Sequence, residues 1–268
     1  MSVALFKNGD QKYTDLDLID CLKQIGIQKG DILYMHSEMY NFGIPLIAPR
    51  QLFSNIINCI FETIGKEGTL IMPTFTYSFC KNEVYDKLYS KSTVGVLTEH
   101  FRKWGGVKRT NDPIFSFAIK GAKEDLFLKD TASCFGENSV FDELTKNNGK
   151  IILFGNKNLG ITYIHHIEEK AQIKHRYYKK FSGYIIDENR NKIKKDINYF
   201  VRDLKQNLLN DREYTLSFIK TTPHYKESNF SGVDIISIEI QPFYNIIYNL
   251  LKKDERILLQ RNQHKSSI

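Results

Sequence analysis

Apolar residues along the chain fall into two kinds of block, and their alternation predicts strands followed by helices. Short apolar runs closed by glycine, proline or polar residues predict buried strands at 31–37, 69–72, 114–119, 150–155 and 232–241. Longer stretches with apolar residues three or four positions apart predict helices at 15–25, 50–64, 95–103 and 242–251. Alternating strands and helices are typical of a layered α/β domain.

One segment departs from this pattern. Residues 184–226 are rich in Asn, Lys and Asp, and we expect an irregular insertion or a helical cap that reaches to about residue 230. With 41% hydrophobic residues, the 268-residue chain can bury a sizeable core, so residues 1–268 are expected to form a single domain. The polar end at 262–268 is expected to fray.

Composition limits the cellular compartment and the partners that we expect for the protein. No apolar stretch approaches the length of a transmembrane helix, and the N-terminus lacks a signal-peptide core, so a cytoplasmic protein is expected. The four cysteines are widely spaced without a Cys-x-x-Cys pair, which argues against a zinc ribbon or a disulfide framework. The net charge of +7 favours an anionic partner only weakly. The basic stretches 174–180 and 192–195 could bind RNA, although solvated surfaces are the favoured interpretation.

The strongest chemical signal lies in residues 160–169, which follow the predicted strand 150–155. On a helix, residues three or four apart share a face, so Thr162, His165 and either Glu168 or Glu169 would line up. A carboxylate beside an imidazole fixes its tautomer and raises its basicity, as a general base near neutral pH requires. The pair would lie beyond the carboxyl end of a strand, where ligands bind in open α/β sheets.

Other interpretations of these polar groups stay open. A His/Glu pair is as often a solvated contact on a helix surface. A metal site is disfavoured and none is expected, because the His-Glu-x-x-His order is absent and no tight Cys/His cluster adds ligands. The polar groups after two other strands, His36-Ser37 and Thr74-Phe75-Thr76, could converge on the same site or could merely cap the next helix.

Four blocks of sequence together look like the aminoglycoside 3-N-acetyltransferase family. They occur in the family's order and at similar spacing: 30–37, 67–76, the Arg-Thr-Asn-Asp-Pro stretch at 109–113 with Ser116, and Thr162-x-x-His165-x-x-Glu168. The likeness extends from about residue 15 to residue 180. The Gly-Thr-Leu-Ile-Met-Pro-Thr-Phe-Thr block at 68–76, taken together with the Thr-x-x-His-x-x-Glu pattern, makes the resemblance specific.

The resemblance implies an N-acetyltransferase that uses acetyl-CoA. Its fold would be a three-layer α/β/α sandwich around a mixed central sheet, distinct from the GNAT acetyltransferases. By motif position, His165 would take a proton from the acceptor amine, Glu168 would hold His165, and Thr76 or nearby N–H groups would stabilise the oxyanion. The residues that would line the acetyl-CoA channel are His36, Ser37, Thr74, Phe75, Thr110 and Ser116.

This chain departs from the family pattern at positions that help to predict the acceptor substrate. Antibiotic-modifying members usually show His-Pro where this chain has Asp112-Pro113, and His-Ser-Ser where it has His36-Ser37-Glu38. A site for polycationic aminoglycosides should be rich in carboxylates. The segment after Gly183, which in the family helps to shape the acceptor pocket, instead carries Lys192, Lys194, Lys195, Arg202 and Lys205. We therefore favour a nucleotide-linked or otherwise anionic amino sugar of the kind used for cell-surface glycans.

Two alternatives remain. One is an aminoglycoside acceptor, which would make the protein an antibiotic-resistance enzyme. The other is a non-catalytic nucleic-acid-binding protein on the same scaffold, which the intact Thr-x-x-His-x-x-Glu pattern disfavours. The expected partners are thus acetyl-CoA and a small amino sugar, without nucleic acid or membrane, and a homodimer is left open.

Overall fold

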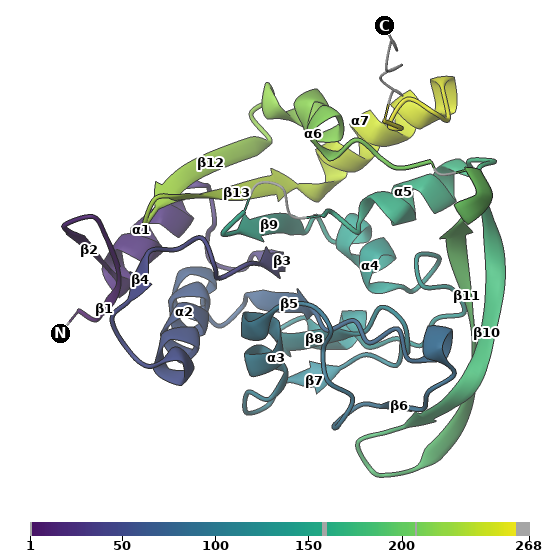
Figure 1. The fold of residues 1–268 in the computed structure, drawn as a ribbon, viewed down its shortest axis with the longest axis horizontal. Helices are drawn as coiled ribbons and strands as arrows, with labels where there is room; N and C mark the ends of the chain where they lie inside the picture. Colours follow the sequence, from purple (N-terminus) through teal and green to yellow (C-terminus); the bar gives the residue numbers. More distant parts are fainter. Residues whose placement is uncertain (1, 157–159, 207, 261–268) are drawn as a thin grey trace, which may run out of the picture.

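A mixed sheet of seven strands forms the centre of the protein. The computed structural model describes residues 2–156, 160–206 and 208–260, and its main sheet has the order β12–β13–β9–β3–β5–β8–β7 (Figure 1). The three middle strands are parallel: β9 (Lys150–Phe154), β3 (Ile32–Ser37) and β5 (Thr69–Pro73). The outer strands add antiparallel pairing on both sides: β12 (Tyr225–Phe230), β13 (Val233–Glu239), β8 (Phe117–Gly121) and β7 (Lys108–Arg109).

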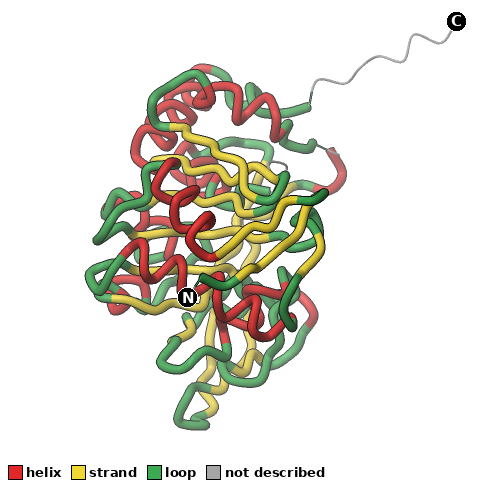
Figure 2. The backbone as a smooth tube through the Cα atoms, turned by 90° about the vertical axis from the view of Figure 1, so that its left-hand side faces the viewer, coloured by secondary structure: helices red, strands yellow, loops and turns green. Residues whose placement is uncertain are grey.

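Helices cover both faces of this sheet because its middle strands are apolar on both sides. In β3, Leu33 and Met35 belong to one hydrophobic core, and Ile32 and Tyr34 belong to another. The first core is closed by α1 (Asp15–Gln24), α2 (Pro49–Ile64) and α3 (Val96–Arg102). The second is closed by α4 (Val140–Lys146), α5 (Ile164–Ala171) and α7 (Ile240–Lys253). The predicted three-layer α/β/α sandwich is confirmed, and Figure 2 shows the sheet strands from the side.

Most helices and strands begin and end close to where capping and turn residues in the sequence predict. Thr14 caps α1: its hydroxyl accepts from the Asp17 N–H, and the Asp17 carboxylate accepts from the Thr14 N–H, which forms a capping box. The strand predicted at 114–119 is wrong at its start. β8 begins only at Phe117, because the Asp112 carboxylate accepts from the backbone N–H groups of Ile114 and Phe115 and holds them in a turn.

The segment expected to be irregular is mostly regular. β10 (Arg176–Ile186) and β11 (Lys192–Arg202) form a long antiparallel hairpin, the curved ribbon beside α5 in Figure 1. Its side chains alternate, so that Ile197 enters the second core while its neighbour Asp196 pairs with Lys180 at the surface. A helix, α6 (Arg212–Lys220), follows before β12. Only this helix matches the expected cap, and the irregular insertion is not found.

Short elements complete the fold. β1 (Ala4–Asn8), β2 (Gln11–Thr14) and β4 (Ile44–Pro45) form a small sheet, and β6 (Tyr85–Asp86) pairs with β10. The described residues also form the 3₁₀ turns η1 (Phe79–Lys81), η2 (Glu124–Phe127) and η3 (Leu204–Gln206). Within the described ranges, no helix combines the length and apolarity that crossing a membrane demands. The end at 262–268, expected to fray, lies outside the described residues.

Candidate active site

The site begins where β3 and β9 end together. These strands are parallel neighbours, and Ser37 lies opposite Phe154 at their carboxyl ends. Gly155 then turns the chain out of β9 with a φ of 102°, and a Cβ there would lie 2.0 Å from the Glu38 carbonyl oxygen. Only glycine fits this close approach. The chain next enters α5, which carries His165 in its first turn.

His165 and Glu168 form the pair that the helical spacing predicts. His165 Nδ1 lies 2.7 Å from Glu168 Oε2, and the structure thereby chooses Glu168 over Glu169 as the partner. The Glu168 side chain is 1% exposed, whereas the His165 side chain is 27% exposed. Because the carboxylate engages Nδ1, Nε2 is the ring nitrogen left for proton exchange with a ligand.

Two residues that sequence reasoning missed complete the support of Glu168. Arg176 Nε, at the start of β10, lies 2.9 Å from Glu168 Oε2. Asn210 Nδ2, just before α6, donates to Glu168 Oε1 at 2.7 Å. Burial alone would raise the pKa of Glu168, but the charges of His165 and Arg176 and the hydrogen bonds from His165 and Asn210 lower it. Glu168 is therefore an ionised carboxylate at neutral pH.

The pKa of His165 is lowered in the structure, whereas the sequence predicts a raised one. The sequence predicts that a carboxylate raises the basicity of the ring. Instead, burial lowers the pKa of His165, the Arg176 charge lowers it further, and Glu168 only partly opposes both. The imidazole is consequently neutral at pH 7 and can accept a proton.

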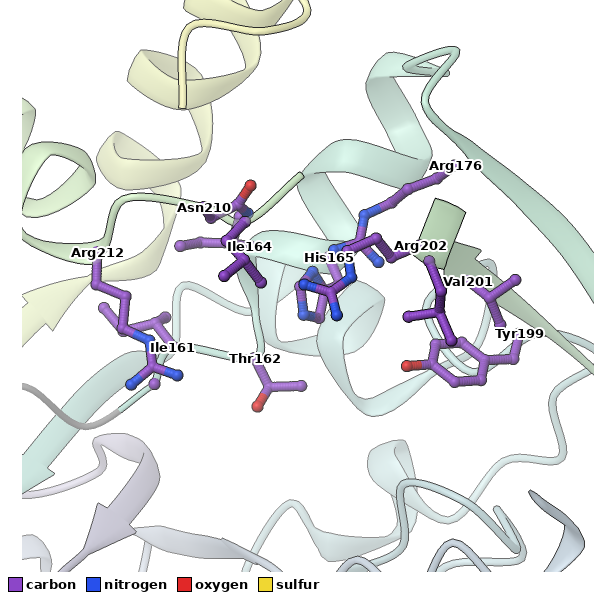
Figure 3. Close-up of a pocket in the computed structure, with 13 residues that line it drawn as sticks. Ile161, Thr162, Ile164, His165, Arg176, Tyr199, Val201, Arg202, Asn210 and Arg212 are labelled. Atoms are coloured by element: carbon purple, nitrogen blue, oxygen red, sulfur yellow. The ribbon is translucent and has the colours of Figure 1, made fainter. Parts of the chain in front are cut away.

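His165 opens into a cavity of about 470 Å³ (Figure 3). The walls come from the start of α5, the end of β11 and the segment that leads into α6. The lining residues are Gly160, Ile161, Thr162, Ile164, His165, Arg176, Tyr199, Val201, Arg202, Leu204, Leu209, Asn210 and Arg212. Among the described residues, this lining holds three arginines and no carboxylate. The described lining is thus basic in composition.

The neighbouring pair, His166 and Glu169, faces away from the cavity. His166 is 0% exposed, its Nδ1 lies 2.6 Å from the Phe135 carbonyl oxygen, and its Nε2 lies 3.2 Å from Thr145 Oγ1. Glu169 accepts from the Ser133 hydroxyl at 3.0 Å. Burial lowers the pKa of His166 to about 4. Both ring nitrogens of His166 have partners, so this histidine supports the core.

Thr76, assigned by resemblance to the oxyanion, is not among the residues that line the cavity with His165. Its hydroxyl donates to the Pro113 carbonyl at 3.0 Å and accepts from the Ser78 N–H and hydroxyl at 3.3 and 3.0 Å. The side chain is buried and does not line the cavity. In this conformation its only proton is used within the loop after β5.

Four of the residues assigned to the acetyl-CoA channel form a buried network at the β5–β8 edge. Arg109 Nε donates to Thr74 Oγ1 at 3.1 Å, and the Ser116 hydroxyl donates to the Thr74 carbonyl at 2.6 Å. Thr110 Oγ1 accepts from the Phe117 N–H at 3.0 Å. The Phe75 ring packs edge-on against Phe117, 5.4 Å between centroids. These polar groups have partners within the protein, which hold the loops at this edge of the sheet.

His36 and Ser37 differ from that network. Both lie at the end of β3, and within the described residues neither His36 Nε2 nor Ser37 Oγ has a hydrogen-bond partner, although both atoms are buried. Buried polar atoms of this kind usually indicate a ligand or water position. Burial lowers the pKa of His36 to about 4, so the ring is neutral. His36 and Ser37 thus place two buried polar atoms without a described partner at the carboxyl end of β3.

The described part of the chain contains no group of three His, Cys, Asp or Glu side chains arranged to hold a metal ion. The cysteines Cys21, Cys59, Cys80 and Cys134 are all free thiols.

Comparison with known proteins identifies the family. The family described as aminoglycoside 3-N-acetyltransferase matches residues 35–252. Aminoglycoside N(3)-acetyltransferase VII of Streptomyces paromomycinus is 25% identical over 190 residues, 63% of this chain and 65% of that protein. Aminoglycoside N(3)-acetyltransferase III of Pseudomonas aeruginosa is 23% identical over 198 residues, 66% of this chain and 72% of that protein. The chain thus spans only about two thirds of the length of these curated relatives.

Solved structures share the fold. AAC-IIIb, solved as a binary complex with CoASH, superposes with a TM-score of 0.75 at 19% identity, covering 89% of this chain and 96% of that one. Because the family match covers most of the chain, including α5 and the β10–β11 hairpin, the protein belongs to the aminoglycoside 3-N-acetyltransferase family of N-acetyltransferases.

Proposed function

We propose that this protein transfers the acetyl group of acetyl-CoA to the amino group of an amino sugar. The observation that carries the proposal is the His165–Glu168 pair, 2.7 Å apart, at the wall of a cavity of about 470 Å³. A cavity of this size holds a small-molecule acceptor. The AAC-IIIb complex with CoASH supports the choice of co-substrate, since that protein shares the fold.

In the proposed reaction, His165 acts as the general base. The neutral imidazole takes a proton from the acceptor amine as its nitrogen attacks the thioester carbonyl carbon. The carbon–sulfur bond breaks, an amide forms, and CoA leaves as its thiol after it receives a proton. Glu168 stabilises the imidazolium that forms on the way, since it is ionised and contacts Nδ1.

Thr76 is a poor candidate for the oxyanion donor in this conformation, because its hydroxyl proton is directed at Pro113. A backbone N–H after β5, or His36 and Ser37 at the end of β3, would have to contribute instead. The unpartnered Nε2 and Oγ atoms of His36 and Ser37 support a place for these residues along acetyl-CoA.

For the acceptor, two candidates have support from different observations. The arginine-lined cavity supports an anionic amino sugar, such as a nucleotide-linked one. The names of the relatives from Streptomyces paromomycinus and Pseudomonas aeruginosa support an aminoglycoside. We favour the anionic acceptor, because a polycationic aminoglycoside would meet a cavity whose described lining residues include arginines and no carboxylate.

The test is a thiol-release assay with acetyl-CoA and three sets of amines: nucleotide-linked amino sugars, free amino sugars and aminoglycosides. His165→Gln runs in parallel as the control for enzymatic turnover. We expect the highest kcat/KM with a nucleotide-linked amino sugar, and its loss in the variant. Comparable turnover of an aminoglycoside would reject the anionic acceptor, and no thiol release with any amine would reject the N-acetyltransferase.

A further inference from the structure

The carboxylate behind His165 depends on a hydrogen bond from outside α5. Asn210 Nδ2 donates to Glu168 Oε1 at 2.7 Å, and the two residues are 42 positions apart in the sequence. The Glu168 side chain is 1% exposed, so water cannot readily take the place of this donor. Figure 3 shows Asn210 beside the start of α5, on the segment that leads into α6. The placement of Asn210 therefore decides whether Glu168 keeps this bond.

The segment after α7, residues 254–260, turns back toward Asn210, and we call it the α7 tail. The Asp254 carboxylate accepts from the Arg256 N–H at 2.9 Å, and the Ile257 N–H donates to the Asp254 carbonyl at 3.1 Å, which reverses the chain. Leu258 is 1% exposed and belongs to the second core. The α7 tail is thus anchored by core packing as well as by its own turn.

The α7 tail holds the backbone on both sides of Asn210. The Asp211 N–H donates to the Leu258 carbonyl at 2.7 Å, and the Gln260 N–H donates to the Leu209 carbonyl at 2.8 Å. These two bonds form an antiparallel β-bridge with Asn210 at its centre. The backbone around Asn210 is therefore paired with the α7 tail, while its side chain contacts the catalytic carboxylate.

The α7 tail also contacts the segment that carries Arg176. Glu255 Oε2 accepts from the Lys174 N–H at 2.9 Å, two residues before Arg176. Arg176 Nε in turn lies 2.9 Å from Glu168 Oε2. The tail consequently joins two segments that are distant in the sequence and that meet at the Glu168 carboxylate.

We propose that the α7 tail positions Asn210 and thereby holds Glu168 in the orientation that supports His165. This inference rests on the proposed function, in which Glu168 stabilises the imidazolium. The α7 tail lies wholly within the described residues and contributes none of the residues that line the cavity. Gln260 is thus a positioning residue that acts through its backbone N–H, because partners of this kind orient the groups that touch the reacting atoms.

Gln260→Pro tests the α7 tail by removing one donor, since proline has no backbone N–H. The side chain of Gln260 is exposed, so Gln260→Ala, which keeps the N–H, is the matched control. We expect Gln260→Pro to lower kcat by about three- to tenfold and to keep the KM for acetyl-CoA within about twofold. Gln260→Ala should match the wild type. Urea unfolding of each variant gives the folded fraction to which kcat is referred.

A double-mutant cycle separates positioning from a general loss of stability. Asn210→Ala removes the donor to Glu168 and should lower kcat by about tenfold. Because the tail acts through Asn210, Gln260→Pro should lower kcat by less than about twofold further when Asn210 is already alanine. Equal losses in the two backgrounds, or a wild-type kcat in Gln260→Pro, would overturn the proposal.

The pKa of Glu168 gives a second measurement that needs no turnover. Burial raises this pKa, whereas His165, Arg176 and the hydrogen bond from Asn210 lower it. In ¹³C NMR titrations, assigned with Glu168→Gln, the pKa of Glu168 should be higher in Asn210→Ala and in Gln260→Pro than in the wild type and Gln260→Ala. An unchanged pKa in Gln260→Pro would reject the positioning role. A raised pKa in a protein that releases no thiol with any amine would reject the N-acetyltransferase reaction alone.

Discussion

Two histidines follow each other on α5, each with a glutamate three residues later, and their surroundings are opposite. His165 pairs with Glu168 at 2.7 Å and lines the cavity, whereas His166 points into the core and bonds Phe135 and Thr145. Adjacent side chains on a helix point about 100° apart. One step along α5 therefore leads from a ring that faces the cavity to a ring that is packed in the core. Amino-acid type alone does not distinguish them.

The pKa is lowered in both His165 and His166, but the consequence differs between the two residues. Burial is the first cause in both histidines and keeps both rings neutral at pH 7. Only His165 combines a neutral ring with an ionised carboxylate behind it and a nitrogen left for a ligand. Neutrality by itself is therefore no indication of catalysis; the free nitrogen is the informative difference.

The largest expected effect is on turnover when His165 is replaced. His165→Gln should lower kcat by about 10²–10⁴-fold, because proton transfer from the amine loses its base. Acetyl-CoA affinity should stay within about twofold, since the base acts on the amine. Steady-state thiol release and calorimetric titration with acetyl-CoA measure the two quantities. Wild-type kcat in this variant would remove His165 from the mechanism.

Glu168→Gln should lower kcat by about 10–100-fold, less than the loss of the base itself. The amide keeps the shape of the side chain but no longer balances the imidazolium or Arg176. The matched replacement in the other pair, Glu169→Gln, should leave kcat within about threefold. A larger loss in Glu169→Gln than in Glu168→Gln, measured by thiol release, would contradict the assignment of the two pairs.

Local periodicity in the sequence was enough to predict that His165 and Glu168 lie together. Helical spacing brought His165 and Glu168 to one face, and the buried runs at β3 and β9 placed them at a strand's carboxyl end. It could not identify Asn210, which reaches Glu168 from 42 residues away through a tertiary contact. Nor could it give the sign of the His165 pKa shift, because burial and the Arg176 charge arise only in the folded chain.

The β10–β11 hairpin was missed for a different reason. Composition was the signal used there, and the outward-facing lysines and aspartates hid the alternation of apolar residues such as Ile193, Ile197 and Tyr199. A period of two, counted over residues 176–202, predicts the strands. Thr76 shows a related limit, since a motif match assigns a position but does not show where the hydroxyl proton points.

His166→Ala should destabilise the fold and leave catalysis nearly unchanged. Loss of the buried ring and of its contacts to Phe135 and Thr145 should lower the free energy of unfolding by about 2–4 kcal/mol. The kcat of the folded fraction should remain within about threefold of wild type. Urea unfolding at pH 7.5 and thiol release well below the unfolding midpoint measure the two. A dead but stable variant would show that the helical phase is wrong.

The lowered pKa of His166 also predicts how the stability of the fold changes in acid. Its folded pKa is about 4 and its ordinary value is 6.5, so the unfolded chain takes up the proton first as the pH falls. Its stabilising contribution is complete above pH 6.5 and is lost between pH 6.5 and about 4, by about 3 kcal/mol. Unfolding free energies of His166→Ala should depend less on pH across this interval than those of the wild type.

The smallest expected effect is a shift of the pH profile in Arg176→Gln. Turnover requires neutral His165, so kcat should rise with pH through a pKa below 6.5 and level off above it. The Arg176 charge helps to lower that pKa, and its removal should move the acid limb of the profile to higher pH. The opposite pair gives the contrast, because His166 is not a proton acceptor and His166→Ala should leave the limb in place. An unchanged limb in Arg176→Gln, or a limb moved by His166→Ala, would assign the titrating group to some other residue than His165.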